Sequence, residues 1–249
     1  MRGLSKLIKM QFVLFLREPI ALFFTLAFPS LLLVLFGAIY GNKPQPAFYG
    51  HNFGTVDTMV PAYVGLIIGT IALMSIPIDV AGNRDAGVLR RYRATPLRPM
   101  AYLVASVVVY FLVALLGMAF LVAIGKLAFD LHMAGSWLSV IAGFTLSALA
   151  FYAAGYLLAS VAPTARVAQT VGMVIFFPMM FLSGAGMPIQ MMPEGVRRIS
   201  DVLPLTYVVQ LMQGLWFGES WGSHLTPVVV LVGLLVVGVV LSARTFRWE

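Results

Sequence analysis

Long apolar runs separated by short polar stretches dominate the chain. A helix needs about 20 residues to cross the roughly 30 Å hydrocarbon core of a membrane, and charged side chains are costly inside it. Six stretches meet this requirement and have no Asp, Glu, Lys or Arg in their interiors, with Asp79 expected at an end: residues 19–40, 58–79, 100–125, 137–162, 167–188 and 223–243. The pattern predicts an all-α membrane protein with six transmembrane helices, forming a single transmembrane domain over residues 1–249.

A seventh apolar stretch, residues 203–218, requires a separate interpretation. Its 16 residues would span about 24 Å as a helix, which is less than the hydrocarbon thickness. We interpret it as a re-entrant or interfacial helix, part of an external segment over residues 189–220 between the fifth and sixth spans.

The distribution of basic residues supports this count. Cytoplasmic loops of membrane proteins carry an excess of Lys and Arg. With six spans and both termini in the cytoplasm, twelve basic residues lie inside and only Lys43, Lys126, Arg197 and Arg198 lie outside. A full span at 203–218 would make the count ten against six. The pattern therefore predicts a multi-pass membrane protein with both termini on the cytoplasmic side.

The first 17 residues predict an amphipathic helix. Basic and polar side chains share one stripe and apolar side chains the other: Arg2, Ser5, Lys6 and Lys9 against Leu4, Leu7, Ile8, Phe12 and Phe15. Such a helix suits the cytoplasmic membrane interface, although a cytoplasmic extension of the first span would show a similar pattern. A cleaved signal peptide is disfavoured, because residues 19–40 are too long for its apolar region.

Within the spans, prolines and glycines indicate local irregularity. Pro29, Pro61, Pro77 and Pro178 predict kinks, which membrane helices tolerate when neighbouring groups satisfy the freed carbonyls. The Gly65-x-x-x-Gly69 spacing permits close approach of a second helix.

Composition excludes several kinds of chemistry. Of 249 residues 61% are hydrophobic and 10% are charged, and the net charge of +7 comes from loop residues that indicate topology rather than nucleic-acid binding. There is no cysteine, and the three histidines are far apart in sequence, so no metal-ligand spacing is present. Span serines lack a nearby acid or histidine, which argues against an intramembrane hydrolase. The lack of ionisable residues within the spans argues against direct coupling to an ion gradient.

The loop over residues 80–99, with the sequence VAGNRDAGVLRRYRATPLRP, contains five basic residues and one acid. Residues 88–93 are compatible with a short helix, and Thr95-Pro96 would end it. A short rigid helix between two spans suits contact with a partner protein that pushes on it. The simpler alternative, a basic cytoplasmic loop with no further role, explains the arginines but not the glycine and proline positions.

This loop resembles the coupling segment of type-2 ABC exporter permeases, in which a pattern close to E-R-E-x-G-T-L-x-x-L-x-x-T-P-L joins the second and third spans. Asp85 keeps one acid of that pattern, and Asn83, Val88 and Tyr92 depart from it. Arg17-Glu18-Pro19 resembles the family's entry to the first span. Leu203-Pro204-Leu205-Thr206-Tyr207 resembles part of its external hairpin. The loop matches at Arg84, Gly87, Leu89, Thr95, Pro96 and Leu97.

The resemblance implies the membrane subunit of an ATP-driven exporter, working as a dimer with two ABC ATPase subunits. ATP and Mg would bind in those partners. This chain is expected to bind no cofactor, and its sequence lacks the G-x-x-x-x-G-K-[ST] phosphate loop. The cargo would be a hydrophobic or amphiphilic small molecule such as a drug, an antibiotic or a lipid-like compound. A lipid-linked polysaccharide and a non-transporting membrane scaffold remain alternatives.

Two sets of candidate site residues follow. Contact with the ATPase is expected at Arg84, Asp85, Gly87, Leu89, Arg90, Arg91, Arg93, Thr95 and Pro96. Thioether and aromatic side chains can re-pack around dissimilar apolar ligands, and on this ground the candidate substrate path is Met173, Phe176, Phe177, Met180, Phe181 and Tyr207. A stripe of this composition also suits simple packing or contact with lipid.

Overall fold

The computed structural model describes residues 2–44, 52–88, 99–187, 189 and 192–245, and this part of the chain is helical and contains no strand. Its six longest apolar stretches are helices of sufficient length and hydrophobicity to cross a membrane. The predicted fold class and number of spans are therefore confirmed. The six candidate spans are Pro19–Tyr40, Thr55–Asp85, Ala101–Phe129, Trp137–Val161, Ala165–Leu182 and Trp221–Thr245.

Several spans are built from more than one helical segment. The first combines α2 (Pro19–Leu22), a π-helical turn (Phe23–Ala27) and α3 (Phe28–Tyr40), and the second combines α5 (Thr55–Thr70), a π-helical turn (Ile71–Ser75) and α6 (Ile76–Asp85). The remaining helices are α1 (Arg2–Leu16), α8 (Pro99–Phe129), α9 (Trp137–Val161), α10 (Ala165–Leu182), α11 (Glu194–Ser200), α12 (Pro204–Trp216), a 3₁₀ turn (Trp221–His224) and α13 (Leu225–Thr245).

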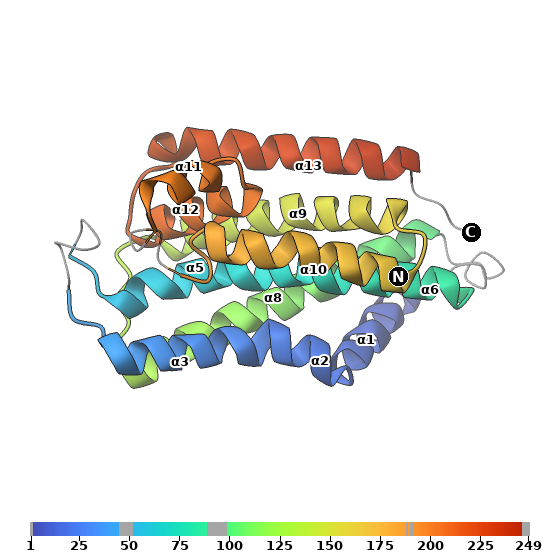
Figure 1. The fold of residues 1–249 in the computed structure, drawn as a ribbon. Helices are drawn as coiled ribbons and strands as arrows, with labels where there is room; N and C mark the ends of the chain where they lie inside the picture. The colour runs from blue at the N-terminus through green and yellow to red at the C-terminus, as the bar shows by residue number, and fades with distance from the viewer. Residues whose placement is uncertain (1, 45–51, 89–98, 188, 190–191, 246–249) are drawn as a thin grey trace.

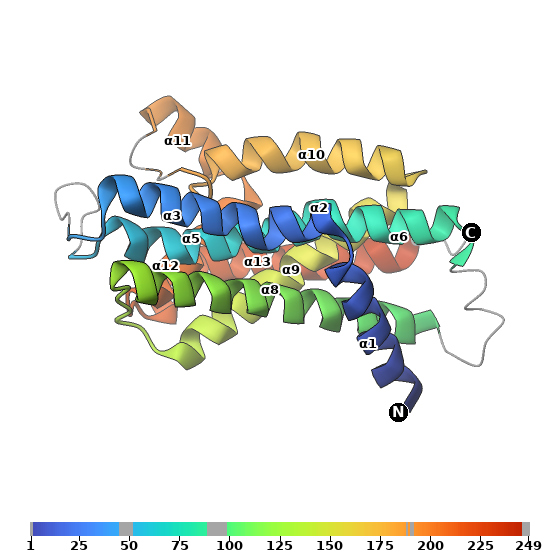
Figure 2. The same ribbon diagram turned by 90° about the horizontal axis from the view of Figure 1, so that it is seen from below.

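The second span forms the centre of the bundle (Figures 1 and 2). Every residue of α5 is buried, and α5 packs against α3, α8, α9, α10 and α12. By contrast, α13 packs mainly on α9 and leaves most of its surface exposed. Because α5 contacts these five helices, a displacement of α5 would change its packing against each of them.

Two prolines coincide with irregular turns. Each π-helical turn begins six residues before a proline, at Phe23 before Pro29 and at Ile71 before Pro77. Proline lacks an N–H and its ring collides with the carbonyl four residues earlier, so the helix widens there. Pro61 and Pro178 lie inside regular α-helix instead.

Glycines allow other helices to approach the central span closely. A Cβ on Gly155 of α9 would lie 2.1 Å from the carbonyl oxygen of Ala72, and one on Gly172 of α10 would lie 2.1 Å from that of Leu73. Both carbonyls belong to the π-helical turn of the second span. The irregular turn is therefore the point where α9 and α10 meet the central helix backbone to backbone.

The predicted close approach at Gly65 and Gly69 is also present. A Cβ on Gly65 would come within 3.3 Å of Val208 and Val209 of α12, and one on Gly69 within 3.3 Å of Phe176 of α10. α12 therefore packs closely on α5 at Gly65, and α10 packs closely on it at Gly69.

The hairpin of α11 and α12, which was predicted to be external, lies against one end of the bundle (Figure 1). The fifth span ends at Leu182 rather than at the expected 188, because Ser183 begins a turn in which Gly184 has a φ of +86°. α12 has 13 residues and buries Trp216 completely. Whether this hairpin enters the membrane stays a prediction.

α1 has the predicted two faces. Leu7 and Phe15 are buried, whereas Lys6 and Lys9 are exposed. α1 runs at a steep angle to α2 and α3 and packs on the beginning of α8 (Figure 2), where Leu7 contacts Tyr102. Its location in the membrane interface stays a prediction.

α1, the end of α6 and the end of α13 all lie at the same end of the bundle, opposite the hairpin (Figures 1 and 2). This arrangement is what an even number of spans requires.

Candidate functional site

The end of the central span is tied to the corner between α9 and α10 by Arg84. The guanidinium of this half-buried side chain donates to the carbonyl oxygen of Ala159, at 3.4 Å, and to that of Ala162. These carbonyls end α9, where no further turn exists to satisfy them. A cation is also favoured by the negative end of the helix dipole. Arg84 thus caps α9 from the neighbouring span.

Asp85 performs the complementary task for the next helix. Its carboxylate accepts a hydrogen bond of 2.9 Å from the N–H of Ala165, the first residue of α10. An anion at a helix N-terminus is favoured by the unpaired N–H groups and by the helix dipole. The pair Arg84–Asp85 therefore clamps both sides of the α9–α10 corner to α6, and Gly87, with a φ of +67°, turns the chain away immediately afterwards.

A second polar group lies one turn before the clamp. The Asp79 carboxylate accepts hydrogen bonds from Tyr110 Oη, at 3.0 Å, and from Asn83 Nδ2, at 2.7 Å. Asn83 Nδ2 also donates to Tyr102 Oη at 2.9 Å. Tyr110 and Tyr102 belong to α8, so these bonds join the central span to the third span.

This arrangement corrects one expectation about the spans. Asp79 was expected at the end of the second span, but the helix continues to Asp85 and places the carboxylate inside it. The reason is that the tyrosine and asparagine donors satisfy the carboxylate, so a membrane helix can continue past it.

Glu18 lies at the joint between α1 and α2, close to the same region. Its side chain is exposed, but the surrounding helices still remove part of its hydration. This desolvation raises the pKa of Glu18 above its ordinary value of 4.5, and the nearby Asp79 carboxylate raises it further.

Of the predicted ATPase-contact residues, the structure describes Arg84, Asp85 and Gly87. The first two contact the chain's own α9–α10 corner. Their contact with a partner ATPase stays a prediction, and the contacts with the α9–α10 corner could not be read from the linear sequence because they join segments far apart in it. The others lie outside the described residues: Leu89, Arg90, Arg91, Arg93, Thr95 and Pro96.

The predicted substrate-path residues do not share one surface. Phe176 and Met180 are 1% and 3% exposed, and Phe176 faces Gly69 of the central span. Met173 and Phe177 are half-buried beside them, whereas Phe181 is 54% exposed on the outer side of α10. Tyr207 belongs to the hairpin, where its hydroxyl donates to the Asp201 carbonyl at 2.6 Å. α10 therefore presents this stripe partly to the core and partly outward.

A polar joint at the hairpin end was missed by sequence reasoning. The buried Asp57 carboxylate accepts hydrogen bonds from the N–H groups of Gly54 and His132, at 3.0 and 2.8 Å, and from Asn42 Nδ2, at 2.8 Å. His132 O in turn accepts from Trp216 Nε1 of α12, at 3.0 Å. Three segments thus meet at Asp57, and α12 joins them through His132. An acid three residues after Gly54 is a helix-start signal and could have marked the residue, but not its distant partners.

Comparison with known proteins agrees with the resemblance noted in the sequence. A family model described as ABC-2 type transporter matches residues 3–217. The probable multidrug ABC transporter permease YbhR of Escherichia coli K12 is 22% identical over 203 residues, covering 76% of this chain and 55% of that protein. YbhS of the same strain, with the same description, is 22% identical over 192 residues and covers 77% and 48%.

A further relative is the transport permease ycf38 of Cyanophora paradoxa, which is 26% identical over 219 residues, or 86% of this chain and 74% of that protein. The chain spans about half the length of the two Escherichia coli relatives. The family model covers most of the chain, and the described residues include six helices that are long and apolar enough to cross a membrane, so the protein is a multi-pass membrane permease that belongs to the ABC-2 type transporter family.

Proposed function

We propose that the chain is the membrane subunit of an ATP-driven exporter that moves hydrophobic or amphiphilic small molecules, such as drugs, antibiotics or lipid-like compounds, out across a bacterial cytoplasmic membrane. Two ABC ATPase subunits supply the energy, and a second permease copy completes the transporter. The ends of the chain and the 83–97 segment face the cytoplasm.

The observation that carries this proposal is the direct continuation of the buried central span into the predicted coupling segment. α6 ends at Asp85, and residues 83–97 begin on its last turn. Arg84 and Asp85 bind that turn to the α9–α10 corner, and Asp79 binds it to α8. A push on the segment therefore acts on four spans together.

The energy required for such a switch is modest. Reversing a two-state equilibrium from 1:99 to 99:1 needs about 5.5 kcal/mol of differential binding. A few charged contacts between an ATPase and the segment supply energy on this scale, because hydrogen bonds to charged groups contribute about 1.5–3 kcal/mol each. Arg90, Arg91 and Arg93 are the proposed donors of these contacts.

The test is ATP-dependent uptake of a fluorescent amphiphilic dye by inverted membrane vesicles of the native host. Vesicles with the chain should accumulate dye when ATP is added, and vesicles from a deletion strain should not. The triple variant Arg90→Ala, Arg91→Ala, Arg93→Ala should insert normally but lose uptake. Uptake that is the same in all three samples would refute the proposal.

The alternative cargo gives a different result in the same deletion strain. Accumulation of a lipid-linked polysaccharide at the inner leaflet, without a change in dye uptake, would assign the permease to that substrate instead.

A further inference from the structure

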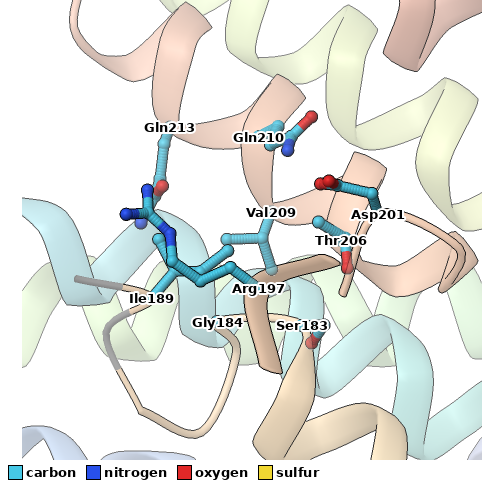
Figure 3. Close-up of a pocket in the computed structure, with 9 residues that line it drawn as sticks. All are labelled: Ser183, Gly184, Ile189, Arg197, Asp201, Thr206, Val209, Gln210 and Gln213. Carbon is cyan, nitrogen blue, oxygen red and sulfur yellow. The ribbon is translucent and has the colours of Figure 1, made fainter. Parts of the chain in front are cut away.

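A cavity of about 230 Å³ lies under the external hairpin, at the end of the bundle opposite the coupling segment. Its walls come from α11, α12 and the turn that follows α10 (Figure 3). Drug-sized ligands occupy sites of about 300–1,000 Å³. The cavity is therefore suited to a smaller group, such as a lipid headgroup, rather than to a whole drug molecule.

Two exposed side chains of opposite charge, Arg197 and Asp201, line the cavity. Arg197 and Asp201 are four residues apart on α11 and its end, a spacing at which opposite charges commonly pair. Nevertheless, among the residues that the structure describes neither side chain has a partner within ion-pair distance. Figure 3 shows the guanidinium on the side of Gln213 and the carboxylate on the side of Gln210. The cavity thus presents one cationic group and one anionic group at separate positions.

Neutral polar groups lie beside each charge. Gln213 uses its amide N–H to donate to the Thr58 carbonyl of α5, at 3.0 Å, so its amide oxygen is left as an acceptor. Gln210 also lines the cavity with both its donor and its acceptor. The floor is apolar and is formed by Val209 and Ile189.

The hairpin holds the cavity in a fixed shape. Thr206 Oγ1 donates to the Ser200 carbonyl at 2.6 Å, which joins the beginning of α12 to the end of α11. Tyr207 Oη donates to the Asp201 carbonyl at 2.6 Å. The backbone that carries the carboxylate is therefore held before any ligand arrives, which lowers the entropic cost of binding.

The apolar surface next to the cavity indicates the rest of the ligand. The turn at Ser183 follows directly on α10, whose outer side exposes Phe181 and Val174 by 54% and 68%. An acyl chain could lie along this side while its headgroup occupies the cavity.

We propose that this cavity binds a zwitterionic headgroup, in which an anionic phosphate or carboxylate contacts Arg197 and an ammonium group contacts Asp201. The geometry favours a zwitterionic membrane lipid over a free zwitterion. The inference concerns a separate external site and does not depend on the identity of the exported cargo or on ATP.

The experiment is calorimetric titration of the purified full-length permease in detergent with dihexanoyl phosphatidylethanolamine, dihexanoyl phosphatidylglycerol and phosphoethanolamine. Saturable binding of the phosphatidylethanolamine is expected. Arg197→Gln and Asp201→Asn should each weaken it about tenfold or more, since each removes a hydrogen bond to a charged group. Arg198→Gln and Glu194→Gln, on the same helix but outside the cavity lining, are matched controls and should bind as the parent does.

Each outcome decides the proposal. Tighter binding of the lipid than of phosphoethanolamine assigns the site to a membrane lipid, and equal binding assigns it to a soluble zwitterion; both support the proposed chemistry. If phosphatidylglycerol binds as tightly as phosphatidylethanolamine, the cavity is a simple anion site and the proposal is overturned. The same conclusion follows if Arg197→Gln abolishes lipid binding and Asp201→Asn does not. No saturable binding by a parent protein with a normal gel-filtration profile and thermal midpoint also overturns it.

Discussion

At the scale of single residues, polar side chains in this protein act mainly as joints between helices. Arg84, Asp85 and Asp79 tie the central span to three others at one end. Asp57 joins three segments at the other end, with α12 linked to them through His132. Because few donors and acceptors are available inside an apolar bundle, each joint has a large effect on where its helices sit.

The Arg84 clamp is testable by Arg84→Gln. The variant loses the charged hydrogen bonds to the end of α9, so the free energy of unfolding should fall by about 1–3 kcal/mol. Thermal unfolding of the detergent-purified protein measures this as a lower midpoint. Arg166→Gln is the matched control, because Arg166 lies at the same end and is exposed. Equal midpoints for the two variants would show that the clamp adds nothing to stability.

The joint at Asp57 is testable by Asp57→Asn. Both carboxylate oxygens accept hydrogen bonds, and an amide replaces one acceptor by a donor, so about 1–3 kcal/mol of stability should be lost. Asp130→Asn serves as control, since that side chain is 96% exposed. The midpoint of thermal unfolding should fall only in the first variant, and an unchanged midpoint would argue against a structural role for Asp57.

Glu18 predicts a pH dependence. Because its pKa is raised in the folded protein, the folded state binds this proton more tightly than the unfolded chain does. Stability contributed by Glu18 therefore falls as the pH rises from about its ordinary pKa of 4.5 through the raised value. Glu18→Gln should raise the thermal midpoint at pH 7, and the gain should disappear below pH 4.5. A gain that is independent of pH would contradict this origin.

At the scale of elements, the irregular turn of the second span determines how α9 and α10 pack. Gly155 and Gly172 contact the carbonyls of Ala72 and Leu73 with no space for a Cβ. The widening before Pro77 exposes these carbonyls to the neighbouring helices. Small residues at such contacts permit the close backbone approach on which membrane helices depend.

Gly155→Ala tests this contact directly. The added methyl group must displace α9 from the central span, which should cost about 1–3 kcal/mol. Gly233→Ala on α13 is the matched control, because a Cβ there would meet nothing within 4 Å. Its effect should be neutral or slightly stabilising, since alanine favours helix more than glycine does. Equal midpoints in thermal unfolding would show that α9 does not depend on the close approach.

The elements were largely predictable from the sequence, whereas their joints were not. Apolar runs of sufficient length predicted six spans, and the alternation of Lys6 and Lys9 with Leu7 predicted the two faces of α1. Hydrophobic pattern determines such features locally. By contrast, the carbonyl groups that Arg84 contacts, those of Ala159 and Ala162, lie 75 and 78 residues further along the chain. The extension of the second span to Asp85 likewise depends on donors supplied by α8.

At the scale of the whole molecule, the two ends of the bundle carry different structural features. One end gathers α1, the end of α6 and the end of α13 around the proposed ATPase contact, and the other carries the hairpin and its charged cavity (Figure 1). The central span connects the two ends. This arrangement fits a permease in which work done on one face alters access at the other.

The most direct test of this account is affinity purification of the tagged chain from its native host in mild detergent, with its partners identified by mass spectrometry. We predict stoichiometric recovery of a protein that carries an ATP-binding phosphate loop, and its loss in the Arg90→Ala, Arg91→Ala, Arg93→Ala variant. Recovery of the chain alone, even after cross-linking through residues 83–97, would contradict the proposal that it is the membrane subunit of an ATP-driven exporter.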